Sequence, residues 1–416
     1  MIHRLARSGI AQLLLAVLFG GILGVCNPSL AIQMKPLSEV FLGIIAWVTP
    51  PVMFILLCSS VARLVGHPGS ARLALKTVGY WQLMSLLSLS CGILLALLLQ
   101  PGSNNALLSP IAADSHTSTD VIAQLPALVL QTFEQSLILK VLLAALVCGY
   151  LLGLSGQAGT ALQQRLDQGV SMIFRLMRGI VRFAPLAAFA AIAFTIGKYG
   201  MTAAIPLLKF IATLYLASLV YITLVLGFAL RLLRLRLWRL ILHVKEALLL
   251  VAATGSSVAA LPKLLEKLEA AGCNSHVARL VLTGGYSFNL NGSNLYLSVA
   301  MVFLAQMAGT DLSAQQLLLL LLVSLFTSLG ATSVAGSAFV ILTATLSALQ
   351  FAPMELLGIL VGVERLMKCR SLTNVLGNCV ACLFISKCHD ALDVEQARRV
   401  LGQHRPQRGA LRLNEE

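Results

Sequence analysis

The chain has 416 residues, of which 58% are hydrophobic and only 11% are charged. Soluble domains carry about 25% charged residues, so this composition leaves too little polar surface for a protein surrounded by water. The formal charge of +14 comes from 30 Lys and Arg against 16 Asp and Glu. The composition excludes an ordinary soluble domain and indicates a helical membrane protein.

The first half of the chain predicts six membrane-spanning helices. A helix crosses the hydrocarbon core with about 20 apolar residues, and clear runs of this kind are Ile10–Val25, Tyr80–Leu99, Leu137–Leu154 and Ile211–Leu230. Prolines at 50 and 51 in the second helix and at 185 in the fifth should kink their helices, because each removes a backbone donor.

The basic residues alternate between successive loops. They cluster at positions 4–7, 63–76, 165–182 and 231–245, whereas no Lys or Arg occurs between Pro101 and Leu139. Such clusters mark cytoplasmic loops, because positive segments resist translocation. We therefore expect both termini to be cytoplasmic. We interpret the excess charge as a sign of topology within a lipid bilayer, and we expect no nucleic-acid partner.

The second half predicts two helical hairpins that enter and leave the membrane on the same side. In Glu246–Leu261, two apolar arms flank the polar tip TGSS, and each arm is too short to span the bilayer. The stretch SLGATSVAGSA divides Leu317–Leu349 in the same way. Lys245 and Lys263 flank the first hairpin but no Lys or Arg flanks the second, so the two should open to opposite sides.

Each hairpin is followed by an apolar segment with a polar middle, Val281–Leu304 and Leu356–Phe384. Two such units of opposite orientation form an inverted repeat, and Gly-interrupted segments at corresponding positions point to a binding site near the bilayer midplane. We interpret Asn289–Asn294 as an unwound helix middle that faces this site. The alternative is that these residues only hydrogen-bond neighbouring helices.

The last apolar segment carries an arginine. Arg370, Asn374 and Asn378 are spaced i, i+4, i+8 and so share one helical face. An intramembrane Arg is a candidate functional residue, and its planar fork suits a carboxylate. On a continuous helix Glu364 would lie about 120° away from Arg370. Lys368 is then its better partner at i+4, which leaves Arg370 to bind an anion.

These features resemble the dicarboxylate/amino acid:cation symporters, which have the glutamate-transporter fold, and most closely their bacterial aerobic C4-dicarboxylate branch. The resemblance extends from about Ala11 to Asp393 and is carried by FAPLAAFAAIAFTIGKYG, TGSSVAALPKLLEKLE, GYSFNLNGSNLYL and RSLTNVLGN. It implies an all-α integral membrane protein with eight transmembrane helices, two opposed re-entrant hairpins and inverted repeats. It also implies an elevator-type transporter that forms a homotrimer in the bacterial inner membrane.

The resemblance also implies a division of the chain and two groups of site residues. Residues 1–240 would form six helices of the scaffold and part of the transport domain, 241–393 the transport core, and 394–416 a basic cytoplasmic tail. The implied substrate site comprises Ser256, Ser257, Val334, Gly336, Ala338, Arg370, Thr373 and Asn374. The implied cation site comprises Gly285, Ser287, Asn289, Leu290, Asn291, Ser328, Ala331 and Asn378. The coupling ion would be H⁺ or Na⁺, and no other cofactor is expected.

The sequence departs from the family pattern at several positions. The usual NxDG motif here ends in Asn291–Gly292, so an amide replaces a carboxylate, and Asn378 replaces an acid common in the glutamate branch. Glu364 lies six residues before Arg370 instead of seven, which leaves room for altered or lost transport. Met367 stands where amino-acid transporters place an Asp for the ammonium group, which favours succinate, fumarate, malate or a similar dianion.

Competing functions explain less of the sequence. A channel would account for polar spans but not for a single Arg beside two hairpin tips. No Ser/His/Asp set, metal-ligand cluster or phosphate loop is evident in the sequence, so we do not expect an enzyme. We interpret the CxxC of Cys379 and Cys382 as helix packing. An acidic or neutral amino-acid symporter and a transport-impaired paralogue acting as a sensor remain alternatives to the dicarboxylate symporter.

Overall fold

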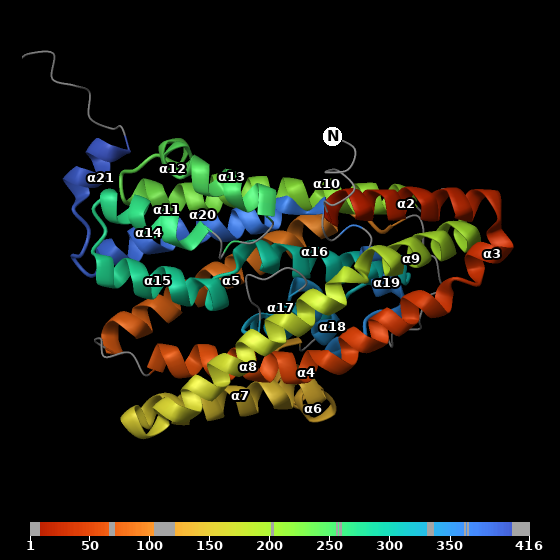
Figure 1. Cartoon of the computed structure of the whole chain (residues 1–416), viewed down its shortest axis with the longest axis horizontal. Coiled ribbons are helices and arrows are strands. Elements are labelled where there is room, and N and C mark those ends of the chain that lie inside the picture. The colour runs from red at the N-terminus through yellow and green to blue at the C-terminus, as the bar shows by residue number, and fades with distance from the viewer. Residues whose placement is uncertain are drawn as a thin grey trace, which may run out of the picture.

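The computed structural model describes residues 9–65, 71–103, 121–200, 204–254, 257, 260–330, 337–361, 363 and 366–401. These residues form helices joined by loops, with an isolated β-bridge between Cys273 and Leu392. Many of the helices run along the long axis of the molecule (Figure 1). Within the described ranges, five helices are long and apolar enough to cross a membrane: Pro28–Arg63, Leu75–Leu99, Leu137–Leu154, Ile205–Leu232 and Lys368–Cys388.

The first half consists of long helices. They are α2 (Gly9–Cys26), α3 (Pro28–Ile32), α4 (Lys35–Val65), α5 (Ala71–Leu99), α6 (Val121–Gln135), α7 (Leu137–Leu154), α8 (Gly156–Arg182), α9 (Ala184–Tyr199) and α10 (Ala204–Val220). A π-helical stretch, η2 (Tyr221–Leu226), continues α10 into α11 (Gly227–Leu232).

The prolines act differently in the two predicted places. The fifth predicted span corresponds to α9, and Pro185 lies in the first turn of this helix, directly after α8 ends at Arg182. The expectation of a kink within one helix was wrong there, because a proline at a helix start loses no intrahelical hydrogen bond. In contrast, α4 continues as one helix through Pro50 and Pro51.

The second half consists of shorter helices. They are α12 (Leu237–His243), α13 (Lys245–Thr254), α14 (Leu261–Ala270), α15 (Ser275–Phe288), α16 (Asn291–Met307), α17 (Ala314–Ser328), α18 (Ser337–Leu349), η4 (Met354–Leu356), α19 (Leu357–Val361), α20 (Lys368–Cys388) and α21 (Val394–Val400). The pairs α13/α14 and α17/α18 occupy the two predicted hairpins, and each pair precedes an interrupted helix, α15/α16 or α19/α20.

The predicted last span is not one helix. It ends as α19 at Val361 and resumes as α20 at Lys368. The pairing of Glu364 with Lys368 stays a prediction, because Glu364 lies outside the described residues. The shared face of Arg370, Asn374 and Asn378 is confirmed, since all three lie within α20.

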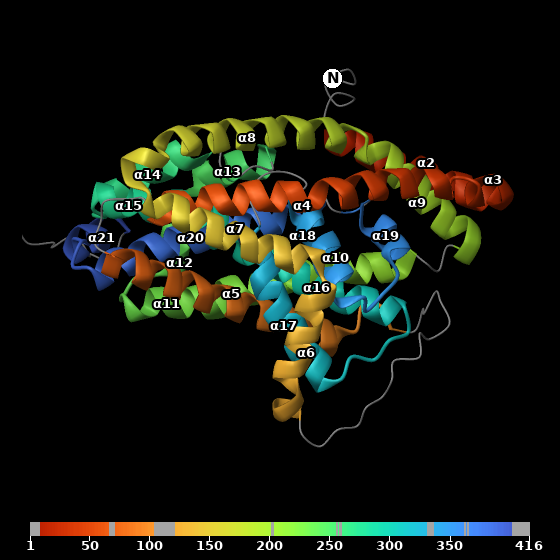
Figure 2. The ribbon, with the colours of Figure 1, turned by 90° about the horizontal axis from the view of Figure 1, so that it is seen from below.

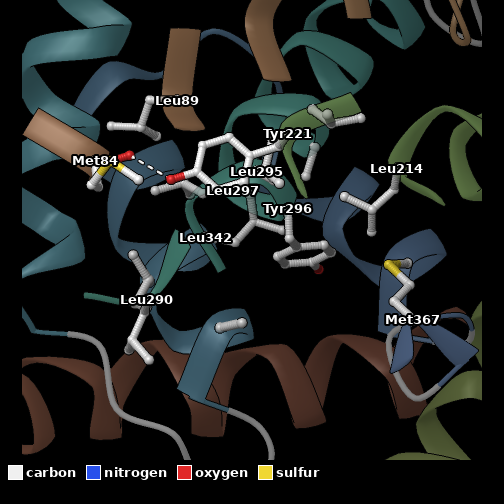
Figure 3. Packing of buried hydrophobic residues seen from close by; sticks show 14 of the residues in the cluster. Met84, Leu89, Leu214, Tyr221, Leu290, Leu295, Tyr296, Leu297, Leu342 and Met367 are labelled. Carbon is white, nitrogen blue, oxygen red and sulfur yellow. Dashed lines mark hydrogen bonds between the residues drawn. The ribbon is translucent and has the colours of Figure 1, made fainter. Parts of the chain in front are cut away.

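The core is centred on α16. Every residue of this helix except Gln306 is buried, and it packs against α5, α10, α18 and α20. Figure 3 shows side chains of α16 among Leu89, Leu214 and Leu342, which come from α5, α10 and α18. Beside them, the Tyr221 hydroxyl donates to the Met84 carbonyl at 3.2 Å (Figure 3).

The outer helices expose large apolar side chains. Phe19 on α2, Trp47 on α4 and Leu154 on α7 are between 56% and 85% exposed. Figure 2 shows α8 along one edge of the molecule, with α4 and α7 beside it. Apolar surface of this extent suits contact with lipid or with another protein.

Candidate substrate and cation site

The polar middle of Val281–Leu304 is a narrow helix break. Asn289 (φ −125°, ψ 61°) and Leu290 (φ −101°, ψ 60°) leave the helical conformation. The Gly285 and Leu290 carbonyls each accept one backbone N–H, from Asn289 and Asn294 respectively, at 3.0 Å. The predicted unwound middle is confirmed but shorter than expected, because residues 291–294 form the first turn of α16.

An asparagine from α20 caps this new helix. The Asn374 Oδ1 accepts the backbone N–H groups of Gly292 (2.8 Å) and Ser293 (3.2 Å), and its Nδ2 donates to the Ser293 Oγ (3.2 Å). Leu290 at the N-cap has no side chain that can do this. Asn374 thus satisfies two backbone donors that a helix start leaves without intrahelical partners.

Three buried asparagines lie together at this break: Asn289 and Asn291 on its two sides, and Asn378 of α20. The Asn289 Nδ2 donates to the Asn378 Oδ1 at 2.8 Å, and both side chains are fully buried. The Asn291 amide lies against Gly377, the neighbour of Asn378. The Oδ1 atoms of Asn289 and Asn291 are buried without a hydrogen-bond partner, as are the Nδ2 atoms of Asn291 and Asn378. Buried polar atoms are nearly always bonded, so these two oxygens suit a hard cation or a proton donor.

Arg370 lies in the first turn of α20, beside the first turn of α16. A Cβ added to Gly292 would collide with the Arg370 carbonyl, so only glycine allows this approach of the two backbones. The Arg370 guanidinium carbon is 5.5 Å from the ring centroid of Tyr296, a distance suited to a cation–π contact. Met367, the N-cap of α20, makes no side-chain capping bond. Two helix N-termini and one Arg therefore meet, an arrangement that favours an anion.

The tip of the first hairpin reaches the same turn of α20. The buried Ser257 Oγ donates to the Ser371 carbonyl at 3.4 Å. Thr373, predicted for the substrate site, is buried and donates its hydroxyl to the Cys369 carbonyl of its own helix at 2.8 Å. Ala338 is buried near the start of α18. Ser257 thus brings the first hairpin to the helix that carries Arg370.

The remaining predicted residues lie elsewhere or outside the described part of the chain. Ser287 accepts a hydrogen bond from Ser60 of α4 at 3.0 Å, and Ser328 donates to the Leu325 carbonyl of its own helix at 2.9 Å. The predicted residues outside the described ranges are Ser256, Ala331, Val334 and Gly336. The described residues contain no cluster of three His, Cys, Asp or Glu side chains that could hold a metal ion.

Two residues were not singled out from the sequence. Ser293 orients the Asn374 amide through its Oγ, and Tyr296 lies under the Arg370 guanidinium. Both belong to the stretch GYSFNLNGSNLY, whose polar composition within an apolar segment was the sequence signal that could have indicated them as site residues. Figure 3 shows the Tyr296 ring near the core together with Leu290 and Met367.

Comparison with known proteins supports a membrane transporter. A family model described as the sodium:dicarboxylate symporter family matches residues 10–388. The C4-dicarboxylate transport protein 1 of Ralstonia nicotianae is 36% identical over 407 residues, which cover 95% of each chain. The C4-dicarboxylate transport protein of Burkholderia pseudomallei (strain K96243) is 37% identical over 403 residues, which cover 94% of each chain.

Proposed function

Because the chain belongs to the sodium:dicarboxylate symporter family, we propose that it is a secondary transporter that imports C4-dicarboxylates together with cations. The observation that carries this proposal is Arg370, placed in the first turn of α20 against the first turn of α16. A guanidinium at this junction offers a carboxylate two parallel, charge-assisted hydrogen bonds.

The groups around Arg370 support a dicarboxylate over an amino acid. The N-cap of α20 is Met367, which is 2% exposed and carries no charge. An amino-acid substrate would bring its ammonium group close to Arg370 without a carboxylate from this position to offset the repulsion. Relatives named as C4-dicarboxylate transport proteins, from Ralstonia nicotianae and Paraburkholderia phymatum, support the same substrate class.

We further propose an elevator architecture. The short pairs α13/α14 and α17/α18 would be re-entrant hairpins that open to opposite sides, added to eight membrane spans. Residues 241–393, with part of 1–240, would move as the transport domain against a scaffold formed by the rest of 1–240, in a homotrimer with both termini cytoplasmic. The exposed apolar side chains of α2, α4 and α7 support a scaffold that faces lipid and neighbouring subunits.

The position of the helix break favours transport over a transport-impaired sensor. On a continuous helix, the residue missing between Glu364 and Arg370 would rotate what precedes it by about 100°. The chain instead leaves α19 at Val361 and starts α20 at Lys368. A missing residue here shortens a connection, so α20 can keep the orientation that points Arg370, Asn374 and Asn378 to one side.

The charge of the substrate calls for a coupling cation. A dianion that enters against a negative-inside potential needs accompanying cations, because each charge costs about 2.3 kcal/mol per 100 mV. The buried Oδ1 atoms of Asn289 and Asn291 can accept Na⁺ or a protonated group, but neither residue supplies a negative charge. We therefore favour protons over sodium as the coupling ion.

The substrate is tested by competition uptake in proteoliposomes. Unlabelled succinate, fumarate and malate should each inhibit uptake of labelled succinate, and glutamate and aspartate should not. Inhibition of uptake by glutamate alone would assign the protein to the amino-acid branch.

The coupling ion is tested in the same vesicles. Uptake should persist when choline replaces Na⁺ at fixed pH, and an inward pH gradient without Na⁺ should drive it. Uptake that stops without Na⁺ and ignores the pH gradient would reverse the proton preference. In that case Asn291→Asp should raise the apparent sodium affinity by about tenfold, since it restores a charge beside the cation.

A further inference from the structure

A second polar site lies apart from the asparagines, where two outer helices meet the start of α19. A cavity of about 320 Å³ is enclosed by α4, α9 and the segment η4–α19. Its charged walls come from all three elements: α4 contributes Lys35 and Glu39, α9 contributes Lys198, and η4 contributes Glu355. Neither the substrate site nor the cation site uses any of these residues.

The two lysines of the cavity lie near one aromatic ring. The ammonium groups of Lys35 and Lys198 lie 5.9 and 5.5 Å from the ring centroid of Phe194. Lys35 is also paired with Glu39 at 3.0 Å, and both side chains are about two-fifths exposed. With Glu355 on the third wall, the cavity presents two positive and two negative groups. A dicarboxylate dianion would meet as many repulsive groups as attractive ones, whereas a zwitterion finds a partner for each of its charges.

The position of the cavity favours a lipid headgroup as the source of that zwitterion. Helix α4 begins at Lys35 and α9 ends one residue after Lys198, so both ammonium groups lie at the ends of apolar helices. Lysines at such ends reach the headgroup region. A neighbouring cavity of about 500 Å³ has almost wholly apolar walls from α2, α9 and α10, and Thr195 lines both cavities. Hydrocarbon therefore has a place beside the charged site.

We propose that the charged cavity binds a zwitterion that carries a phosphate and a primary ammonium group. The phosphate lies between Lys35 and Lys198, and the ammonium faces Glu39 and Glu355. Phosphatidylethanolamine supplies this chemistry as a headgroup, and O-phosphoethanolamine supplies it as a free molecule. The bound group contacts α4, α9 and the η4–α19 segment together.

The test measures lipid retention by the purified full-length protein. The protein in detergent is incubated with equal amounts of phosphatidylethanolamine, phosphatidylcholine and phosphatidylglycerol of the same acyl chains, and the co-purifying lipids are quantified by mass spectrometry. We expect phosphatidylethanolamine to be enriched about fivefold or more over each of the others. Lys198→Gln and Glu355→Gln should each abolish the enrichment. Lys140→Gln, on the exposed side of α7, is the matched control and should retain it.

A competition with O-phosphoethanolamine identifies the source. If it displaces the lipid and the two variants weaken that displacement, the free zwitterion also occupies the site. If it has no effect while the lipid enrichment depends on Lys198 and Glu355, the site is specific for the lipid. Equal retention of the three lipids, or unchanged enrichment in both variants with melting temperatures like that of the control, would overturn the proposal. Because the readout is lipid retention, it is independent of any transport activity.

Discussion

The two hairpin-plus-helix units, α13–α16 and α17–α20, repeat the same order of parts but complete their helix breaks differently. In the first unit the break is two residues long, and α20 holds it through Asn374 and Asn378. In the second unit α19 ends at Val361 and α20 begins at Lys368, and the N-cap residue Met367 makes no side-chain capping bond. The first helix start is thus capped by Asn374, whereas the second carries Arg370.

This asymmetry separates the two kinds of ligand. Near the start of α20, the helix N-terminus and the Arg370 guanidinium both favour negative charge. Near the first break, amide oxygens with no hydrogen-bond partner favour positive charge. The two places are joined through α20, since Arg370 and Asn378 lie two turns apart on one face. An anion and a cation can therefore be held on the same rigid element.

Removing Arg370 should have the largest effect, because it takes away the only charge that we assign to the substrate site. In Arg370→Ala, dicarboxylate uptake should fall at least about 100-fold, which corresponds to about 3 kcal/mol for a lost charge-assisted fork. Arg370→Lys should be intermediate, since it keeps the charge but not the planar geometry. Uptake is measured in proteoliposomes at matched protein content.

Lys368→Ala is the control, because it removes a cation from the same turn of α20. It should leave uptake within about twofold of the unmodified protein, since Lys368 is not assigned to the site. Near-normal uptake in Arg370→Ala would mean that Arg370 does not bind the substrate carboxylate, and that the second unit is not the anion site.

The next largest effect should come from the link between the units. In Asn378→Ala, the buried Nδ2 of Asn289 loses its acceptor. An unsatisfied buried donor costs about 1–3 kcal/mol, so the melting temperature in detergent should fall. Cys379→Ala is the control, since Cys379 is the next residue of α20 and is also fully buried. A fall of the same size in both variants would assign the loss to packing and not to the amide bond.

The sequence predicts the parts of these units better than the contacts between them. The apolar arms around polar tips mark the hairpins, and NLNGSN marks the first break, because local composition decides both. The sequence does not predict the second break, because GVERLMK contains no proline and resembles a continuation of the apolar helix. Helical spacing places Asn374 beside Arg370, but spacing cannot show that its amide is bonded to the first turn of α16, which lies about 80 residues earlier in the chain.

The hairpins differ in the opposite sense to the breaks, since the buried polar contact lies in the second unit. In the second, the hydroxyls of Thr327 and Thr345 are 2.7 Å apart and fully buried between the arms. In the first, Lys263 and Glu246 form an ion pair at 2.7 Å whose side chains are 43% and 51% exposed. An exposed pair is screened by water and contributes little. The stability of the first hairpin should therefore depend less on the polar contact between its arms than that of the second.

Glu246→Gln tests this with the smallest expected effect. The hydrogen bond from Lys263, and then the charges of Lys263 and Lys267, lower the pKa of Glu246. A carboxyl whose pKa is lowered by folding stabilises the protein above its ordinary pKa of about 4.3, and that stabilisation is lost as the pH falls through the folded value. The variant should thus melt less than about 2 °C below the unmodified protein near neutral pH. The two should converge as the pH falls below the folded pKa of Glu246, where the carboxyl is protonated in both states. Glu266→Gln on α14, measured in the same way, serves as the control. A difference for Glu246→Gln that persists in acid would mean that the carboxyl acts by something other than its charge.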